Sequence, residues 1–268
     1  MDKLAKKEAE LDRILLKLGG VVVAYSGGVD SAYLLFRARE VLKERVLAVS
    51  AVSEIHPEHE KRAAAELAQA LGVKHIVVHT EELNCAEFTN NPPERCYYCK
   101  REFFAKLKEI AARYGYSAII YGANKDDEGD FRPGEKAATE NGARAPLQEA
   151  GLTKEEIREL SRRAGLNTWN KPSMACFSSR FPYGEKITIE KIAKIAAAED
   201  YLRSLGFRQL RVRYHGAIAR LELEEEALLT ALAKRVEIVN RLKEIGFNYI
   251  ALDLEGFRSG SMNETLKR

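Results

Sequence analysis

The chain has 268 residues, enough for one large α/β domain and a smaller second one. Its apolar runs are far shorter than the roughly 20 residues of a membrane-spanning helix, and the charged segment Met1–Lys7 is unlike a signal peptide, so we expect a cytoplasmic protein with no membrane partner. The net charge of +3 is too small to indicate a nucleic-acid partner. Four cysteines in such a protein favour metal binding or catalysis over a disulfide framework.

Strands and helices are predicted to alternate in the first part of the chain. The spacing of the apolar residues predicts a helix over 3–18. Strands are then expected at 20–25, 46–52, 74–79 and 117–122, with helices at 31–43, 58–71 and 100–114. This alternation predicts an α/β fold with a parallel sheet. The loop over 81–99, with the first three cysteines, and the irregular stretch over 122–145 are long connections of the kind that usually carry function.

The pattern changes in the second part of the chain. Thr153, followed three residues later by Glu156, predicts a helix that starts there and runs to about residue 164. After a loop over 168–184, we expect a helix, two strands, a second helix and a last strand, at 188–205, 208–214, 217–223, 224–245 and 248–254. The predicted domains are therefore 1–182 and a smaller C-terminal α+β domain over 183–268.

A glycine-rich turn between a buried strand and a helix is the most specific signal. The apolar run over 21–25 leads into Ser26, Gly27, Gly28, Val29, Asp30 and Ser31. Glycines let the backbone approach a phosphate, and a helix N-terminus favours an anion. The lysine and spacing of a Walker A loop are absent. The hexapeptide instead resembles the SGGxDS signature of the PP-loop ATP pyrophosphatases, which implies ATP bound at Ser26, Gly27, Gly28, Asp30 and Ser31.

The predicted nucleotide site also includes a magnesium ion and the side chain of Ser53. Mg²⁺ would bridge oxygens of the ATP and neutralise the leaving pyrophosphate, and Asp30 is expected to hold this ion or to position the phosphates. Ser53 follows the second predicted strand and is placed to contact the nucleotide.

Cys96 and Cys99 form a CxxC pair, which serves in redox, zinc or iron–sulfur sites. Histidines are scarce, and none has ligand spacing to the pair. With Cys176 as a third thiolate, a [4Fe–4S] cluster with one open iron fits better than a closed zinc site. The alternative is a pair of surface thiols. We interpret Cys85 as structural.

Cys176 lies in a predicted loop between Lys171 and Arg180. Nearby cations favour a nucleophilic thiolate, so Cys176 is a candidate to attack an activated carboxyl group. The alternative is a buried small apolar residue.

Motifs along nearly the whole chain together resemble the LarE family. They are the PP-loop, the stretch Gly122–Asp127 with Asp130 and Arg132-Pro133-Gly134, the segment Lys171–Arg180 and the tail Gly256–Asn263. The resemblance implies a PP-loop domain of the adenine nucleotide α-hydrolase type and an ATP-dependent sulfur transferase that helps to build a nickel-pincer nucleotide cofactor. It implies adenylation of the carboxylates of pyridinium-3,5-dicarboxylate mononucleotide, which then become thiocarboxylates. ATP is expected between the strand ends and the 122–134 loop, with Gly122, Asn124 and Asp127 as contacts.

The resemblance leaves two sources for the sulfur. In the simplest members the cysteine that matches Cys176 forms a thioester and then loses its own sulfur, which leaves dehydroalanine. Members with three cysteines are thought to carry a [4Fe–4S] cluster whose open iron binds the sulfide that is delivered. Cys96, Cys99 and Cys176 match the second pattern, which we favour.

Arg211 and Arg213 alternate along a predicted strand, so both project from one face. Such a pair suits a phosphate or a carboxylate, although a solvated basic stripe is the alternative. The family resemblance implies substrate binding by this pair together with Glu199 and Glu222. It also implies a homo-oligomer, with a hexamer as one assembly, built through the second domain.

Three other functions remain open from the sequence. An iron–sulfur-dependent tRNA thiolase of the same superfamily would also use three cysteines and would bind RNA. An ammonia-dependent PP-loop synthetase would not need Cys176. A nucleotide-binding regulatory protein would hold a structural zinc ion at the CxxC pair without releasing pyrophosphate.

Overall fold

The computed structural model describes residues 3–129, 132–172, 175–258 and 260–266. The chain forms two compact units, one of Met1–Glu82 with Glu94–Met174 and one of Leu83–Pro93 with Ala175–Arg268. The sequence predicts a single domain boundary near residue 182. In the structure the chain enters the second unit near residue 175, and Leu83–Pro93 also belongs to that unit. Hydrogen bonds hold this early segment there: the Gly184 N–H donates to the Asn91 carbonyl at 3.0 Å and the Ile187 N–H to the Thr89 carbonyl at 2.8 Å.

The first unit contains a four-stranded parallel sheet in the order β3-β2-β1-β4, which confirms the predicted α/β fold. From β1 the chain continues outward through β2 and β3, and it then crosses to the other side of β1 to form β4. The direction in which strands are added therefore reverses at the position between β1 and β4. The strands are β1 Val21–Ala24, β2 Val46–Val52, β3 Lys74–His79 and β4 Ala118–Tyr121, close to the predicted ranges.

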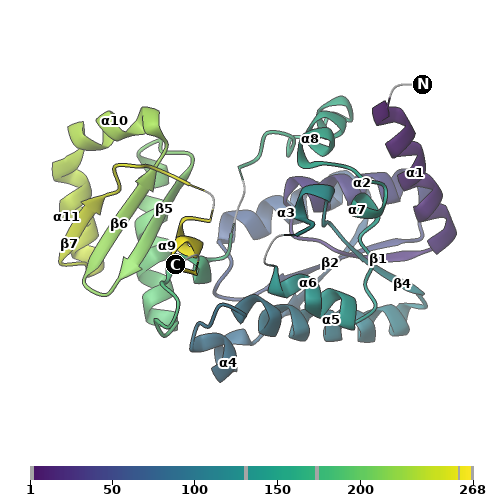
Figure 1. The fold of residues 1–268 in the computed structure, drawn as a ribbon, viewed down its shortest axis with the longest axis horizontal. Helices are drawn as coiled ribbons and strands as arrows, with labels where there is room; N and C mark the ends of the chain where they lie inside the picture. The colour runs from purple at the N-terminus through teal and green to yellow at the C-terminus, as the bar shows by residue number, and fades with distance from the viewer. Residues whose placement is uncertain (1–2, 130–131, 173–174, 259, 267–268) are drawn as a thin grey trace. The chain divides into compact units, whose positions relative to one another are not determined.

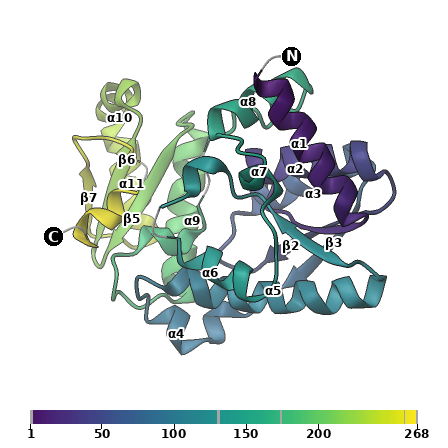
Figure 2. The ribbon, with the colours of Figure 1, turned by 45° about the vertical axis from the view of Figure 1, so that its right-hand side comes forward.

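Helices cover both faces of this sheet (Figure 1), because side chains alternate along a strand and both sets are apolar. Val21 and Val23 pack into one core cluster, whereas Val22 packs into another. Figure 2 shows α1 packed outside α2. One face carries α1 Lys3–Leu18, α2 Val29–Leu42, α3 Glu58–Ala70, α7 Pro146–Glu149 and α8 Lys154–Arg163, and the other carries α5 Arg95–Tyr114 and α6 Pro133–Glu140.

Local signals predicted some helix ends and missed others. The capping box at Thr153 and Glu156 is present and starts α8. The prediction that α5 begins at residue 100 was wrong: the helix begins at Arg95, two residues after Pro93, so Cys96 and Cys99 lie on a helix rather than in a loop. Helix α6 occupies part of the stretch expected to be irregular. The short turn η2 Lys125–Asp127 completes this unit, and η1 Glu82–Asn84 lies where the chain passes into the second unit.

The second unit contains a three-stranded sheet, in which β5 and β6 are antiparallel and β7 is parallel to β6. The helix predicted over 224–245 is divided into η4, α10 and α11, and no glycine or proline marks the break at Lys234. The elements are α4 Ala86–Thr89, η3 Phe177–Arg180, α9 Ile189–Ser204, β5 Leu210–His215, β6 Ile218–Leu223, η4 Glu225–Ala227, α10 Leu228–Ala233, α11 Arg235–Ile245, β7 Tyr249–Leu252 and η5 Ser261–Leu266. Among the helices that the structure describes, none is long and apolar enough to cross a membrane.

Candidate active site

The glycine-rich turn joins β1 to α2 in a conformation that only glycine adopts readily. Gly27 has a φ of +73°, and a Cβ at this position would lie 2.8 Å from the Cβ of Ala64 on α3. The hydroxyls of Ser26 and Ser31 are 3.0 Å apart, and Ser31 donates to the Gly28 carbonyl at 3.2 Å. Since the first N–H groups of a helix have no partner within it, the N-terminus of α2 is suited to bind a phosphate.

Gly122 brings the end of β4 against this same turn. A Cβ on Gly122 would lie 2.8 Å from the backbone nitrogen of Ser31, which is closer than any side chain can approach. The two glycines therefore place the N-terminus of α2 between β1 and β4, at the point where the strand order reverses. Ligands of open α/β sheets bind at such points.

Asp30 lies in the first turn of α2 and forms an ion pair with Lys154 at the start of α8. Its other oxygen, Oδ1, is buried and has no hydrogen-bond partner among the described residues. Burial raises the pKa of Asp30, although the ammonium group of Lys154 opposes this shift. An unpartnered carboxylate oxygen beside a phosphate-binding turn fits the predicted Mg²⁺ and phosphate role.

Asn124 and Asp127 hold the turn that follows β4. The Asn124 N–H donates to Asp127 at 2.9 Å, and the Asp126 N–H donates to the Asn124 side chain at 2.9 Å. Asp127 is also paired with Arg132 at 2.5 Å. These side chains shape the predicted nucleotide loop, and direct contact of either with ATP stays a prediction. Four residues of the segments that resemble LarE, namely Asp130, Ser173, Met174 and Ser259, lie outside the described residues.

Ser53 belongs to a buried polar cluster that the sequence did not reveal. Its hydroxyl donates to Glu82 and lies 3.3 Å from Nδ1 of His56. Burial, helped by Lys100 and Lys61, lowers the pKa of His56 to about 4, so the ring is neutral at physiological pH. The Ser53 hydroxyl is thus occupied within the protein, and its predicted contact with the nucleotide is untested.

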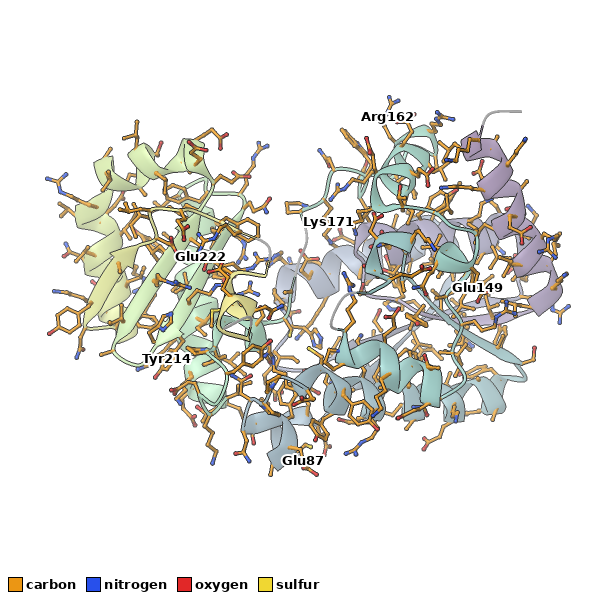
Figure 3. The ribbon with its side chains drawn as sticks, in the orientation of Figure 1. Glu87, Glu149, Arg162, Lys171, Tyr214 and Glu222 are labelled. Carbon is orange, nitrogen blue, oxygen red and sulfur yellow. The ribbon has the colours of Figure 1, made fainter. Side chains whose placement is uncertain are left out.

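Lys171 was expected to act as a cation beside Cys176. In the structure its ammonium group donates to the Gly27 carbonyl at 3.0 Å and pairs with Glu60 at 2.5 Å. Lys171 lies in the segment that follows α8 and is labelled in Figure 3. A residue from far along the sequence therefore fixes the outer side of the glycine turn, a contact that no local pattern indicates.

The cysteines of the predicted cluster belong to different units. Cys96 is exposed and Cys99 half-buried, three residues apart near the start of α5, so both lie on one helix face. Cys176 precedes η3 in the second unit and is half-buried. Among residues 3–129, 132–172, 175–258 and 260–266, no group of three or more His, Cys, Asp or Glu side chains is arranged to hold a metal ion. Cys85 donates to Glu87 at 3.2 Å.

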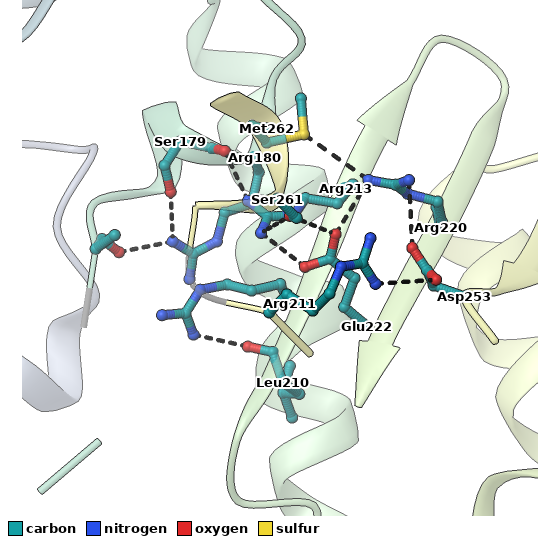
Figure 4. A network of polar contacts seen from close by, with 12 residues as sticks. Ser179, Arg180, Leu210, Arg211, Arg213, Arg220, Glu222, Asp253, Ser261 and Met262 are labelled. Atoms are coloured by element: carbon teal, nitrogen blue, oxygen red, sulfur yellow. Dashed lines mark hydrogen bonds and ion pairs between the residues drawn. The ribbon is translucent and has the colours of Figure 1, made fainter. Parts of the chain in front are cut away.

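The four predicted substrate residues of the second unit are nearly or fully buried. Arg213 donates to Glu222 at 2.6 Å and to the Ser261 hydroxyl at 2.8 Å (Figure 4). Arg211 donates to the Leu210 carbonyl at 2.8 Å and lies over the ring of Phe257. Because both arginines lie at alternate positions of β5, they project from one face, as predicted. Glu199 instead pairs with Arg180, which is expected from the sequence to be a cation beside Cys176.

The sheet order, the glycine turn at its reversal point and the phosphate-binding helix end define an ATP-using protein of the PP-loop class. A comparison with known families agrees: the NAD synthase family model matches residues 11–126, which include this turn.

Relatives extend the match to the whole chain. The chain is 44% identical to the pyridinium-3,5-bisthiocarboxylic acid mononucleotide synthase of Lactiplantibacillus plantarum, covering 100% of this chain and 98% of that protein. It is 42% identical to an uncharacterized protein of Synechocystis, with the same coverage. An uncharacterized protein of Methanocaldococcus jannaschii is 29% identical over 89% of this chain and 91% of its own. The chain belongs to the LarE family, as its motifs predicted.

A matched pair of glycine substitutions tests the turn. Gly27→Ala adds strain at positive φ and a clash with Ala64. Gly142→Ala adds strain alone, since Gly142 has a φ of +71° and a Cβ there would meet no neighbouring group within 4 Å. We expect Gly27→Ala to cost about 2–4 kcal/mol of stability and Gly142→Ala about 1 kcal/mol. ATP affinity, measured by calorimetry, should fall at least about tenfold in Gly27→Ala only. Equal affinities in the two variants would contradict this role of the turn.

His56 should make stability depend on pH. Its pKa is about 4 in the folded protein and near 6.5 in the unfolded chain, so the unfolded state binds the proton first as pH falls. The contribution of His56 to the free energy of unfolding is constant above pH 6.5. As the pH falls from 6.5 to 4, this free energy decreases by up to roughly 3 kcal/mol. Urea unfolding of His56→Gln should show a weaker decline over this interval than the unsubstituted protein. The same decline in both would show that His56 is not the group responsible.

Proposed function

We propose that this chain is an ATP-dependent sulfur transferase. It adenylates the carboxylates of pyridinium-3,5-dicarboxylate mononucleotide and converts them to thiocarboxylates, a step in the synthesis of the nickel-pincer nucleotide. The observation that carries the proposal is the end-to-end identity of 44% with a protein named for the bisthiocarboxylic acid product. The phosphate-binding turn supports the ATP-dependent half of the reaction, since adenylation requires the α-phosphate to be held beside the carboxylate.

The first unit would bind ATP. The backbone of Gly27 and Gly28 and the hydroxyls of Ser26 and Ser31 would surround the phosphates, and Asp30 would accept Mg²⁺ or orient it. The buried and unpartnered Oδ1 of Asp30 supports this assignment. When bound, Mg²⁺ neutralises the pyrophosphate that leaves.

The second unit would bind the anionic groups of the substrate. Burial, together with the nearby guanidinium groups of Arg180, Arg213 and Arg203, lowers the pKa of Arg211 to about 10, and Glu199 offsets this only in part. A guanidinium group so crowded by like charges favours an anion nearby. The phosphate and the carboxylates of the mononucleotide have the required charge, and guanidinium groups form strong charged hydrogen bonds with both kinds of anion.

Cys176 would be the point of sulfur transfer, with Cys96 and Cys99 as partners. A [4Fe–4S] cluster held by these three thiolates would supply an open iron that binds sulfide. The helix face shared by Cys96 and Cys99 supports two of the three ligands. In the alternative version, the sulfur atom comes from Cys176 itself.

A cytoplasmic location stays a prediction from the sequence.

Cys176→Ala separates adenylation from sulfur transfer. With ATP and the dicarboxylated mononucleotide, the variant should still release pyrophosphate, because the ATP residues lie in the first unit, but should form no thiocarboxylate. Mass spectrometry of the product and a pyrophosphate assay provide the two readouts. A thiocarboxylate formed by Cys176→Ala would refute the assignment, and loss of pyrophosphate release alone would indicate a different role for Cys176.

Iron and acid-labile sulfide in protein purified without oxygen distinguish the two sulfur sources. Under the cluster version, iron is lost in Cys96→Ala and Cys99→Ala but kept in the control Cys85→Ala, and Cys176 is intact after turnover. Under the other version, the protein contains no iron even after reconstitution, and Cys176 becomes dehydroalanine.

We also propose that the chain forms a homo-oligomer through its second unit. Large apolar side chains are exposed on its outer elements: Leu229 and Leu232 on α10, Val236 on α11 and Tyr249 on β7, with Leu229 78% and Tyr249 67% exposed. Exposed apolar side chains concentrated on neighbouring elements are typical of association surfaces.

Substitution of this surface should change the assembly. Leu229→Glu with Val236→Glu is expected to convert the oligomer to a monomer, because each buried glutamate would lose hydration without a partner. Light scattering measures the mass. Leu16→Glu on α1 is the control, since Leu16 is 61% exposed in the first unit. A monomeric unsubstituted protein, or an unchanged mass in the double variant, would contradict the proposal.

A further inference from the structure

Glu199 has no free capacity to bind a substrate. Its side chain is fully buried, and both oxygens already accept two hydrogen bonds each. Oε1 accepts from Nε of Arg180 at 2.8 Å and from the Val212 N–H at 3.1 Å. Oε2 accepts from Arg180 at 2.9 Å and from Arg203 at 2.9 Å. A carboxylate has about four acceptor positions, and all of them are occupied here.

Arg180 uses its remaining nitrogen on the turn that carries Cys176. The guanidinium group is fully buried, and its Nη1 donates to the carbonyl oxygens of Ala175 at 2.7 Å and Cys176 at 3.0 Å. Nη1 also lies 3.0 Å from the Ser179 hydroxyl, which donates in turn to the Cys176 carbonyl at 2.9 Å. The backbone on both sides of the cysteine is therefore fixed by one planar group.

The other end of this arrangement lies on β5. Val212, whose N–H is bound by Glu199, stands between Arg211 and Arg213 in the sequence of the strand. Arg213 makes a second link, because its Nη1 donates to the Ser179 carbonyl at 2.8 Å (Figure 4). The turn with Cys176 and the strand with the two arginines are thus joined twice by charged hydrogen bonds inside one unit.

We propose that Arg180 and Glu199 are positioning residues that fix Cys176 relative to Arg211 and Arg213. Glu199 then does not contact the substrate, in contrast to the role that the family resemblance implied. The catalytic consequence rests on the proposed function, since Arg211 and Arg213 would hold the substrate whose carboxylate must meet the cysteine.

Burial alone does not account for this pair. A buried ion pair can often be replaced by apolar side chains of similar volume without loss of stability. Arg180, however, directs its third nitrogen to three oxygen atoms of a single turn, so its geometry specifies the position of that turn. Burial acts to raise the pKa of Glu199, but Arg180, Arg203 and the Val212 N–H overcome it and lower the pKa, which keeps the carboxylate charged.

Two variants remove the positioning with different effects on the fold. Arg180→Lys keeps the charge but cannot reach both Glu199 and the turn, because an ammonium group is not a planar fork. Arg180→Met combined with Glu199→Gln is a neutral pair in which the glutamine can still accept from the Val212 N–H. The control is Arg203→Met, which removes a partner of Glu199 that is 21% exposed and leaves the turn untouched.

The first readout does not depend on activity. The full-length proteins are treated with iodoacetamide, and labelling of Cys176 is compared with that of Cys85, an internal standard in the same unit. We expect the ratio of Cys176 to Cys85 labelling to rise at least about fivefold in both positioning variants, because thiol reactivity follows access, and to stay unchanged in Arg203→Met. An unchanged ratio, including a parallel rise at both cysteines, would overturn the proposal.

The second readout is catalytic. Sulfur transfer should fall by about 100-fold in both variants, the usual effect of a small misplacement of reacting groups, with pyrophosphate release changed less than about threefold. Full sulfur transfer in either variant would overturn the positioning role. If the unsubstituted protein makes no thiocarboxylate but the labelling ratio still rises, the proposed function has failed and the positioning of Cys176 stands.

Discussion

The close approach of three backbones at the N-terminus of α2 is the constraint on which the first unit depends. Gly27 faces Ala64 of α3, and Gly122 faces the Ser31 nitrogen, each at a distance that excludes a Cβ. These contacts bring the first turn of α2 to the reversal point of the sheet. Lys171 and Lys154 then act on the same turn, one at the Gly27 carbonyl and one at Asp30. The proposed phosphate site is made mostly of backbone, so it requires small residues beside it, and the long side chains of Lys154 and Lys171 reach it from elsewhere in the chain.

The second unit solves a different problem, the burial of several arginines near one another. Glu199 and Glu222 each accept hydrogen bonds from two arginines, so each carboxylate compensates more than one positive charge. Burial, and then the neighbouring guanidinium groups of Arg180, Arg213 and Arg203, still lower the pKa of Arg211. The proposed binding of a phosphorylated, carboxylated ligand relies on this group of arginines, and the hydrogen bonds of Arg180 and Arg213 hold the turn that carries Cys176.

Sequence patterns predicted what depends on neighbours along the chain. The alternation of strands and helices, the Thr153–Glu156 capping box and the glycine turn all have local causes, and the structure has each of them. The pairing of Lys171 with Glu60 and of Arg180 with Glu199 joins residues that no periodicity connects, so the roles of these cations could not be inferred. The early start of α5 was missed because Pro92 and Pro93 indicate a loop but do not indicate where it ends.

Because Leu83–Pro93 belongs to the second unit, the order in which the chain is translated affects how that unit folds. The chain passes between the two units three times, so neither unit is a single continuous stretch. During translation, Leu83–Pro93 leaves the ribosome well before the segment over 182–187 that supplies its hydrogen-bond partners. The second unit therefore completes its fold only after the first has been synthesised in full. A gene divided at residue 182 would deprive the second unit of one of its own parts, and a circular permutation that rejoined this segment would be needed to express it alone.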